Sequence, residues 1–408
     1  MKTVGTIVRG IRTPIIRSGD DLVGIVVESV LNASKREKFL IQDRDIICVT
    51  EAVVSISDNN YASLDDIVAD LKRKFQGDNL GIVYPILSRN RFSMLLRAFA
   101  KAFKNITMLL SFPSDEVGNP IMDIERLKSS KINPFTDTLN YETYRKTFGT
   151  FLHPHTEVDI LSYYENVVKE VGSFIEFVFS NNPNVITNYT SNVLVSSIHT
   201  RKALKEELKS DDITLYGLDD VLCEPINGSG YNETYGLLGS NFTSKNKIKL
   251  FPNNNHFVYD VQNKIKRITG KKVEVMIYGD GAFKDPYSGI WELADPVVSP
   301  SFTDGLKGSP REVKLKMLAL EKYENLNTRD LEAAIKNEIE NKTSNVNNDA
   351  SLGTTPRRYV DLIGSLADLT SGSGDKGTPV VYIQNYFKNK YKWKFKENLH
   401  VIVWVFLL

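Results

Sequence analysis

Apolar and polar positions over the first 80 residues change from a helical to a strand pattern and back. Apolar side chains recur at helical spacing over 22–31, and Asp20 or Asp21 is placed to cap that helix. A continuous apolar run over 45–49 predicts a short buried strand. Residues 64–75 form an amphipathic pattern that predicts a second helix. The pattern is that of an α/β protein.

The middle of the chain repeats this alternation and then loses it. A strand over 82–87, a helix over 91–104 and a strand over 106–112 predict a parallel βαβ unit. Residues 113–160 show little periodicity and predict a long irregular segment. Beyond it we expect, in order, a helix over 161–179, a strand over 192–198 and a helix over 201–209.

The last third has a clear pattern again. We expect a helix over 258–269 that Gly270 stops, a strand over 272–277, a helical hairpin over 311–340, a linker over 341–356, a helix over 359–369 and a buried strand over 401–408. The final apolar run of eight residues is far shorter than the roughly 20 that span a bilayer as a helix. We therefore expect no membrane partner.

Composition narrows the class of protein. The chain has 408 residues, 41% of them apolar, which is enough for two or three domains. Its 51 basic and 50 acidic side chains give a charge of +1 and no general support for nucleic-acid binding. The two cysteines, Cys48 and Cys223, make no disulfide framework. With no apolar signal segment at the N-terminus, we expect a cytoplasmic protein with reduced cysteines.

A loop rich in glycine and aspartate follows the predicted strand over 272–277. Glycine lets backbone N–H groups approach an anion, and carboxylates beside it can hold a divalent ion. The candidate residues are Gly279 and Gly281 for nucleotide, Asp280 and Asp285 for metal, and Lys284 for phosphate. The alternative is a plain tight turn, because Gly-Asp-Gly and Asp-Pro are common in turns.

A second glycine-rich loop precedes the apolar run over 380–383. It combines small residues with one acid and one lysine, as a phosphate-binding loop requires. The candidate nucleotide-binding residues are Gly372, Ser373, Gly374, Asp375, Lys376 and Gly377. The alternative is a flexible linker, although the apolar run beside it argues against a free one.

Other polar residues follow predicted strands. Thr50 and Glu51 come directly after the run over 45–49, where they could contact a nucleotide or metal or could simply begin a helix. Thr13 lies beside Arg12 and could contact an anion, although single arginines are usually solvated. His153 and His155 precede two acids but lack a zinc-site spacing, so a surface loop is expected there.

Taken together, these segments resemble the coenzyme F420-0:L-glutamate ligase family of gamma-glutamyl ligases. The residues that carry the resemblance are 19–22, 45–55, 268–277 and 371–381. It covers about half of the chain. We therefore divide the chain into a first part of a ligase-like domain over 1–80, an inserted or divergent α/β segment over 80–230, and a second ligase-like part over 231–408.

The resemblance implies an α/β (α+β) fold of mixed sheets with helices, in an intertwined homodimer. Members use GTP and a divalent metal to join L-glutamate to a carboxylate acceptor, so the substrates expected here are GTP or ATP with Mg²⁺ or Mn²⁺. The carboxylate would first become an acyl phosphate. Lys284, Lys376 and the metal would offset the charge, and Glu51 is a candidate base.

Two positions depart from the family pattern. The family usually has a lysine where Ile56 stands, and an aspartate where Leu238 stands within 236–241. The loss of a metal ligand leaves the acceptor open. The alternatives are a non-catalytic nucleotide- or metabolite-binding relative, and a glutamate ligase that acts on a folate-like or other acceptor.

Overall fold

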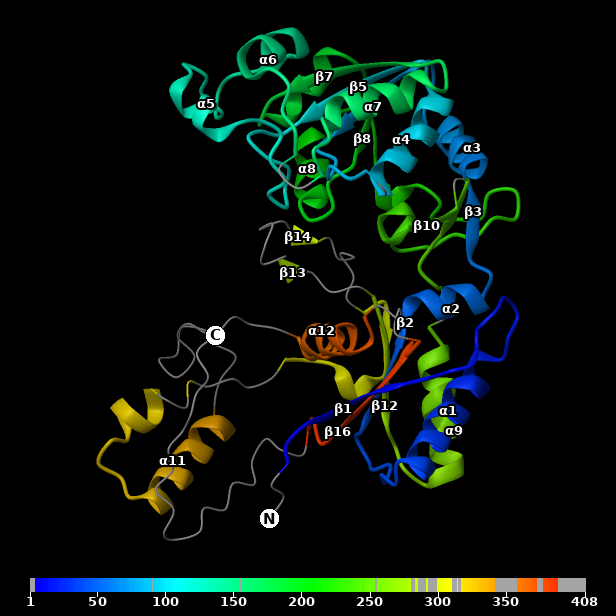
Figure 1. Cartoon of the computed structure of the whole chain (residues 1–408), viewed down its shortest axis with the longest axis vertical. Coiled ribbons are helices and arrows are strands. Elements are labelled where there is room, and N and C mark those ends of the chain that lie inside the picture. The colour runs from blue at the N-terminus through cyan, green and yellow to red at the C-terminus, as the bar shows by residue number, and fades with distance from the viewer. Residues whose placement is uncertain are drawn as a thin grey trace.

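The computed structural model of the chain has mixed α/β content arranged around two large sheets (Figure 1). Residues that the structure describes are 4–89, 91–153, 156–244, 246–253, 255–279, 283–284, 291–292, 299–309, 314, 317–341, 358–372 and 377–387. The six-stranded sheet occupies the upper half of Figure 1 and the five-stranded sheet the lower half. This confirms the expected fold class of mixed sheets with helices.

The five-stranded sheet joins the two ends of the chain. Its order is β1 (Ile7–Ile11), β16 (Val380–Gln384), β2 (Ile46–Thr50), β12 (Glu274–Tyr278) and β15 (Ser301–Phe302). β2 and β12 are parallel, and the other neighbours are antiparallel. β1, near the start of the described chain, and β16, near its end, therefore belong to the same sheet.

Helices cover both faces of this sheet, which explains why β2, β12 and β16 are buried along their whole length. Ile47 and Val49 of β2 pack with α1 (Leu22–Arg36) and α9 (Phe257–Thr269). Ile46 and Cys48 point the other way and pack with α12 (Tyr359–Ser371). Asp21 caps α1 as predicted, accepting a 2.9 Å hydrogen bond from the Gly24 N–H.

The six-stranded sheet is built from the middle of the chain. Its order is β6 (Leu139–Asn140), β7 (Phe174–Phe179), β5 (Asn105–Leu110), β4 (Asn79–Val83), β8 (Asn192–Val195) and β9 (Thr214–Gly217). All neighbours are parallel except β6, which is antiparallel to β7. The predicted βαβ unit is confirmed, with α4 (Arg91–Ala102) between β4 and β5.

A small sheet lies where the chain passes from one large sheet to the other. α2 (Glu51–Ser57) leads through β3 (Tyr61–Ser63) into α3 (Leu64–Lys74), and β3 pairs with β11 (Lys247–Lys249), which pairs with β10 (Asn241–Ser244). Figure 1 shows α2, β3 and β10 between the two halves. A two-residue hairpin pair, β13 (Phe283–Lys284) with β14 (Trp291–Glu292), completes the sheets.

Two sequence expectations for the middle were wrong. The helix expected over 161–179 is α7 (Ile160–Lys169) followed by β7, because Gly172 turns the chain at φ +83° and the aromatic and β-branched run after it fills the sheet. Residues 113–160 contain α5 (Ile124–Ser129) and α6 (Tyr141–Phe148). Both are short helices with local caps, from Asp123 and Asn140.

Of the remaining elements, α8 (Arg201–Leu208) and α12 agree with the helices expected over 201–209 and 359–369, and α11 (Thr328–Asn341) with the second half of the hairpin expected over 311–340. The others are the π-helical η5 (Leu318–Lys322), and the 3-10 turns η1 (Pro183–Asn188), η2 (Leu218–Asp220), η3 (Gly236–Gly239) and η4 (Asp304–Leu306). Gly270 ends α9 at φ +71°, as expected. Residues 342–356 of the expected linker and the expected strand over 401–408 lie outside the described residues. Among the described helices, none combines the length and apolarity that a bilayer crossing requires.

Candidate functional site

Four strand ends meet at one edge of the five-stranded sheet. Thr50, the last residue of β2, pairs in parallel with Tyr278, the last residue of β12. Val380 begins the antiparallel β16 and lies opposite Ile11, the last residue of β1. The Thr50 N–H donates a 2.9 Å hydrogen bond to the carbonyl oxygen of Pro379. Residues that follow β1, β2 and β12, or precede β16, therefore gather at the same edge.

The two glycine-rich loops also begin at this edge. The Tyr278 hydroxyl donates a 2.5 Å hydrogen bond to the Ser371 hydroxyl, although the two residues are 93 positions apart. Both side chains are buried. Ser371 ends α12, and Gly372 caps that helix in the left-handed conformation at φ +55°. The first loop thus begins at Tyr278 and the second at Ser371, and a hydrogen bond joins these two starting residues.

The structure describes only part of the predicted site. Gly279, Thr50, Gly372 and Gly377 lie at this edge, at or next to the contacts described above. Lys284 lies in β13, paired with Trp291. Outside the described residues are Asp280, Gly281, Asp285, Ser373, Gly374, Asp375 and Lys376. The roles of all these residues stay predictions.

Thr13 lies just beyond the end of β1, next to the start of β16. Its side chain is half-buried, and its hydroxyl donates a 2.9 Å hydrogen bond to the carbonyl oxygen of Pro14. Because Ile11 pairs with Val380, Thr13 follows the same sheet edge as the second loop. The position suits the predicted contact with a nucleotide.

Thr378 is a polar residue of this edge that the sequence did not single out. Its Oγ1 atom is buried and has no hydrogen-bond partner among the described residues. The side chain lies against Gly10, where an added methyl group would come within 3.1 Å of it. A buried hydroxyl of this kind costs free energy unless a partner satisfies it. Thr378 is therefore a further candidate contact for a ligand at this edge.

Glu51 is engaged in a buried ion pair. Its Oε1 lies 2.8 Å from Nζ of Lys249 on β11, and the two side chains are 10% and 7% exposed. Protonating Glu51 would leave the Lys249 ammonium as an uncompensated buried charge. This contact argues against Glu51 as the base. The sequence carried no signal for Lys249, which pairs with a residue 198 positions away.

The two departures from the family pattern lie in different surroundings. Leu238 is fully buried in η3, within the apolar core of the six-stranded sheet, and its carbonyl oxygen accepts a hydrogen bond from Arg91. Ile56 is half-buried on α2. The segment over 236–241 thus supplies packing and no carboxylate.

The segment over 153–159, which contains His153, His155 and two acids, is explained in part by local structure. Asp159 caps α7 and lies 2.6 Å from Arg145, so its carboxylate is already used. His155 lies outside the described residues. Across the part of the chain that the structure describes, no three His, Cys, Asp or Glu side chains group as metal ligands. The predicted metal ligands Asp280 and Asp285 lie outside that part.

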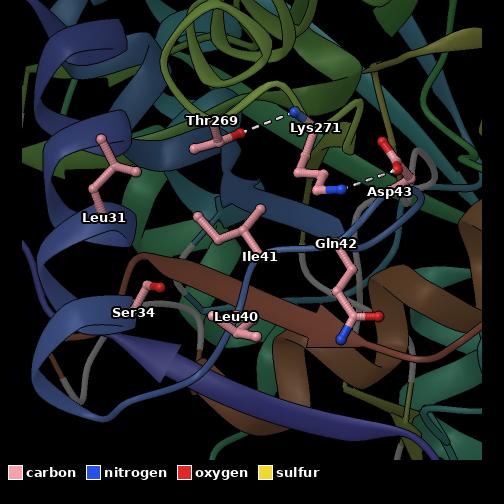
Figure 2. A pocket seen from close by; sticks show the side chains of 8 residues that line it. All are labelled: Leu31, Ser34, Leu40, Ile41, Gln42, Asp43, Thr269 and Lys271. Carbon is pink, nitrogen blue, oxygen red and sulfur yellow. Dashed lines mark hydrogen bonds and ion pairs between the residues drawn. The ribbon is translucent and has the colours of Figure 1, made fainter.

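The hollow shown in Figure 2 belongs to the opposite edge of the same sheet. It has a volume of about 560 Å³ and is lined by residues that precede β2 and β12 and by the end of α1: Leu31, Ser34, Leu40, Ile41, Gln42, Asp43, Thr269 and Lys271. Asp43 and Lys271 form an ion pair of 3.7 Å across it. It does not include the loops after β2 and β12, and we assign it no part in the candidate site.

Comparison with known proteins adds one match. The model of the family described as F420-0:Gamma-glutamyl ligase matches residues 10–385, which is nearly the whole chain and includes the middle segment over 80–230. No curated protein matches the chain.

Proposed function

The chain belongs to the F420-0:gamma-glutamyl ligase family, and on that premise we propose that it is a nucleotide- and metal-dependent ligase that adds L-glutamate to a carboxylate acceptor. The observation that supports this most directly is the hydrogen bond between Tyr278 and Ser371. It holds the bases of two loops together at the end of two parallel strands. A triphosphate bound there would contact backbone N–H groups from both loops.

The proposed reaction has two steps. A carboxylate oxygen of the acceptor attacks the γ-phosphorus, the bond to the nucleoside diphosphate breaks, and an acyl phosphate forms. The amino group of L-glutamate then attacks the acyl carbon, phosphate leaves, and the nitrogen gives up a proton. Lys284 and Lys376 would lie against the transferring phosphoryl group and offset its charge. Thr50, Thr13 and the loop glycines would orient the nucleotide.

A divalent cation fits the donor chemistry of the two loops, since Asp280 and Asp285 offer carboxylate oxygens on the first and Thr378 offers a buried hydroxyl on the second. When bound there, Mg²⁺ or Mn²⁺ would neutralise charge on the polyphosphate. The Glu51–Lys249 pair would remain structural, and the proton of the glutamate amine would pass to water or phosphate.

A non-catalytic nucleotide-binding relative is the second candidate. The observation that favours it is Leu238, which is packed in an apolar core where the family pattern has an acid.

The third candidate is a glutamate ligase that acts on a folate-like molecule. It differs from an F420-0-like ligase only in the acceptor. The intertwined homodimer remains part of this proposal, as does the division into parts over 1–80, 80–230 and 231–408.

The test is phosphate release by the full chain with GTP or ATP, Mg²⁺ or Mn²⁺, L-glutamate and a panel of carboxylate acceptors. We expect release that requires both glutamate and one acceptor, and its loss in Asp280→Ala and Lys376→Ala. Lys72→Ala is the matched control, because Lys72 is an exposed lysine on α3. Nucleotide binding by calorimetry without any release would favour the non-catalytic candidate. Full turnover in Asp280→Ala and Lys376→Ala would remove those roles.

A further inference from the structure

The six-stranded sheet reverses its strand order between β4 and β8. From β4 the chain proceeds outward through β5 to β7, and it then returns to place β8 and β9 on the other side of β4. The helix after β4, α4, packs on one face of the sheet, while α8 after β8 packs on the other. In doubly wound sheets the crevice at such a reversal, beyond the carboxyl ends of the strands, is where ligands bind.

The loop after β8 surrounds a carboxylate from elsewhere in the chain. Glu116 accepts hydrogen bonds from the Ser197 hydroxyl at 2.8 Å and from the Ile198 N–H at 2.5 Å. It also accepts from the His199 N–H at 3.2 Å, and from the Thr200 N–H at 3.3 Å and hydroxyl at 3.2 Å. We call residues 197–200 the cradle. They lead directly into α8, whose amino-terminal end favours an anion.

The segment that carries Glu116 connects the loop after β8 to the loop after β4. We call residues 113–120 the strap. Asp115 is buried in the strap and accepts a 3.0 Å hydrogen bond from the Leu87 N–H, in the loop after β4. Asn119 donates a 2.8 Å hydrogen bond to the same carboxylate. None of the ion pairs among the described residues involves Glu116, so the cradle alone meets its charge.

A separate observation identifies an unsatisfied polar group next to the cradle. The Ser196 side chain is 1% exposed, and its hydroxyl has no hydrogen-bond partner among the described residues. The Ser196 N–H bonds to the Val83 carbonyl oxygen, so the strand alternation continues and turns this side chain to the same face as Leu194. That is the face of α4. The hydroxyl therefore lies at the carboxyl end of β8, on the side of the sheet that α4 covers.

We propose that this crevice is a second binding site, for a small molecule that carries a phosphate or carboxylate group. The oxyanion of the ligand replaces the Glu116 carboxylate in the cradle, and the Ser196 hydroxyl bonds to another polar atom of the same ligand. His199 and Thr200 are exposed, so the cradle can be reached from solvent once the strap moves. The proposal does not rest on the ligase function, because the site belongs to the other sheet.

The first test removes the carboxylate that occupies the cradle. Glu116→Ala should bind inorganic phosphate or acetate at least about tenfold more tightly than the wild-type chain, because five donors become available. Calorimetry at constant ionic strength measures this, and the stronger of the two anions identifies the group that the ligand carries. Glu116→Ala with Ser197→Ala should lose most of the gain. Equal affinities in the wild type and Glu116→Ala would overturn the proposal.

The second test uses the unaltered chain, so that it holds even if the variants do not fold. High concentrations of the anion should speed hydrogen exchange in the strap, which is displaced, while the amides of residues 198–200 stay protected. Sodium chloride at the same ionic strength is the control. Exchange in the strap that responds equally to chloride, or to neither salt, would contradict displacement of Glu116.

Discussion

At the scale of single residues, the Tyr278 hydroxyl is the link between the two loops of the candidate site. Tyr278→Phe keeps the buried ring and removes the hydroxyl that donates to Ser371. We expect a stability loss of about 1 kcal/mol in urea unfolding. We also expect KM for the nucleotide to rise by about tenfold, because loop positioning loosens.

Ser371→Ala removes this hydrogen bond and also the longer one, of 3.4 Å, from the Ser371 hydroxyl to the Asp368 carbonyl oxygen, so we expect the same two effects with a slightly larger stability loss. The double variant should be no worse than Ser371→Ala alone, because the hydrogen bond that Tyr278→Phe removes is then already absent. Additive losses would mean that the two hydroxyls act separately.

The two cysteines differ in their surroundings, and their reactivity should differ accordingly. Complete burial raises the pKa of the Cys48 thiol, and partial burial also raises that of Cys223. Because the thiolate is the reactive form, we expect iodoacetamide to modify the folded chain only at Cys223, at a rate that increases with pH. Peptide mass spectrometry measures this.

The same raised pKa favours the protonated Cys48 in the folded state. This contribution to stability is present below the ordinary thiol pKa of 9.0 and is lost as the pH rises above it. Cys48 packs against α12, so modification of Cys48 in the folded chain would show that α12 separates readily from the sheet.

At the scale of elements, the Glu51–Lys249 pair joins α2 to β11 and so connects the candidate edge to the small sheet. Glu51→Ala should lower the free energy of unfolding by about 3–5 kcal/mol, because it leaves a buried ammonium without a counter-charge. Adding Lys249→Met should restore much of that loss. Urea unfolding of the single and double variants measures both effects.

This pair also separates a structural role of Glu51 from a catalytic one. If the ion pair is structural, the stable double variant should retain turnover. A stable double variant whose turnover is lost would restore Glu51 as the base.

The sequence predicted elements best where one local pattern decided them. β2 and β12 are mostly apolar and buried throughout because helices cover both faces of their sheet, and α9 ends at Gly270 because that residue adopts a left-handed conformation. The helix expected over 161–179 failed because a run of aromatic and β-branched residues fits either state until its neighbours are known. Two short capped helices within 113–160 were too brief to show periodicity.

Contacts between distant elements could not be predicted from the sequence, for a different reason. Tyr278 with Ser371 and Glu51 with Lys249 depend on the order of strands in a sheet, which no local pattern encodes. The glycine-rich loops were visible as motifs, and the structure shows that their first residues lie together. Glu116 gave no sequence signal, since a glutamate in an irregular segment is ordinarily solvated.

At the scale of the whole molecule, the five-stranded sheet depends on a strand from the far end of the described chain. β16 lies between β1 and β2 and pairs with both, so it is internal to the sheet. A chain that ends at residue 377 would lack this strand and would expose the apolar faces of β1 and β2. We expect such a chain to lose the cooperative unfolding of the sheet and to aggregate, as measured by circular dichroism and light scattering.

A chain that begins at Thr6 is the matched control, because it removes residues before β1 and keeps all five strands. The strands of the six-stranded sheet lie within residues 79–217, and the core that covers them extends over residues 62–250, so protease-resistant fragments from this wider range should survive in the truncated chain. Their survival would indicate that the second anion site can persist without the ligase edge. A truncated chain with an unchanged cooperative transition would show instead that β16 adds little to its sheet, and the tie between Thr50 and Pro379 would lose its structural importance.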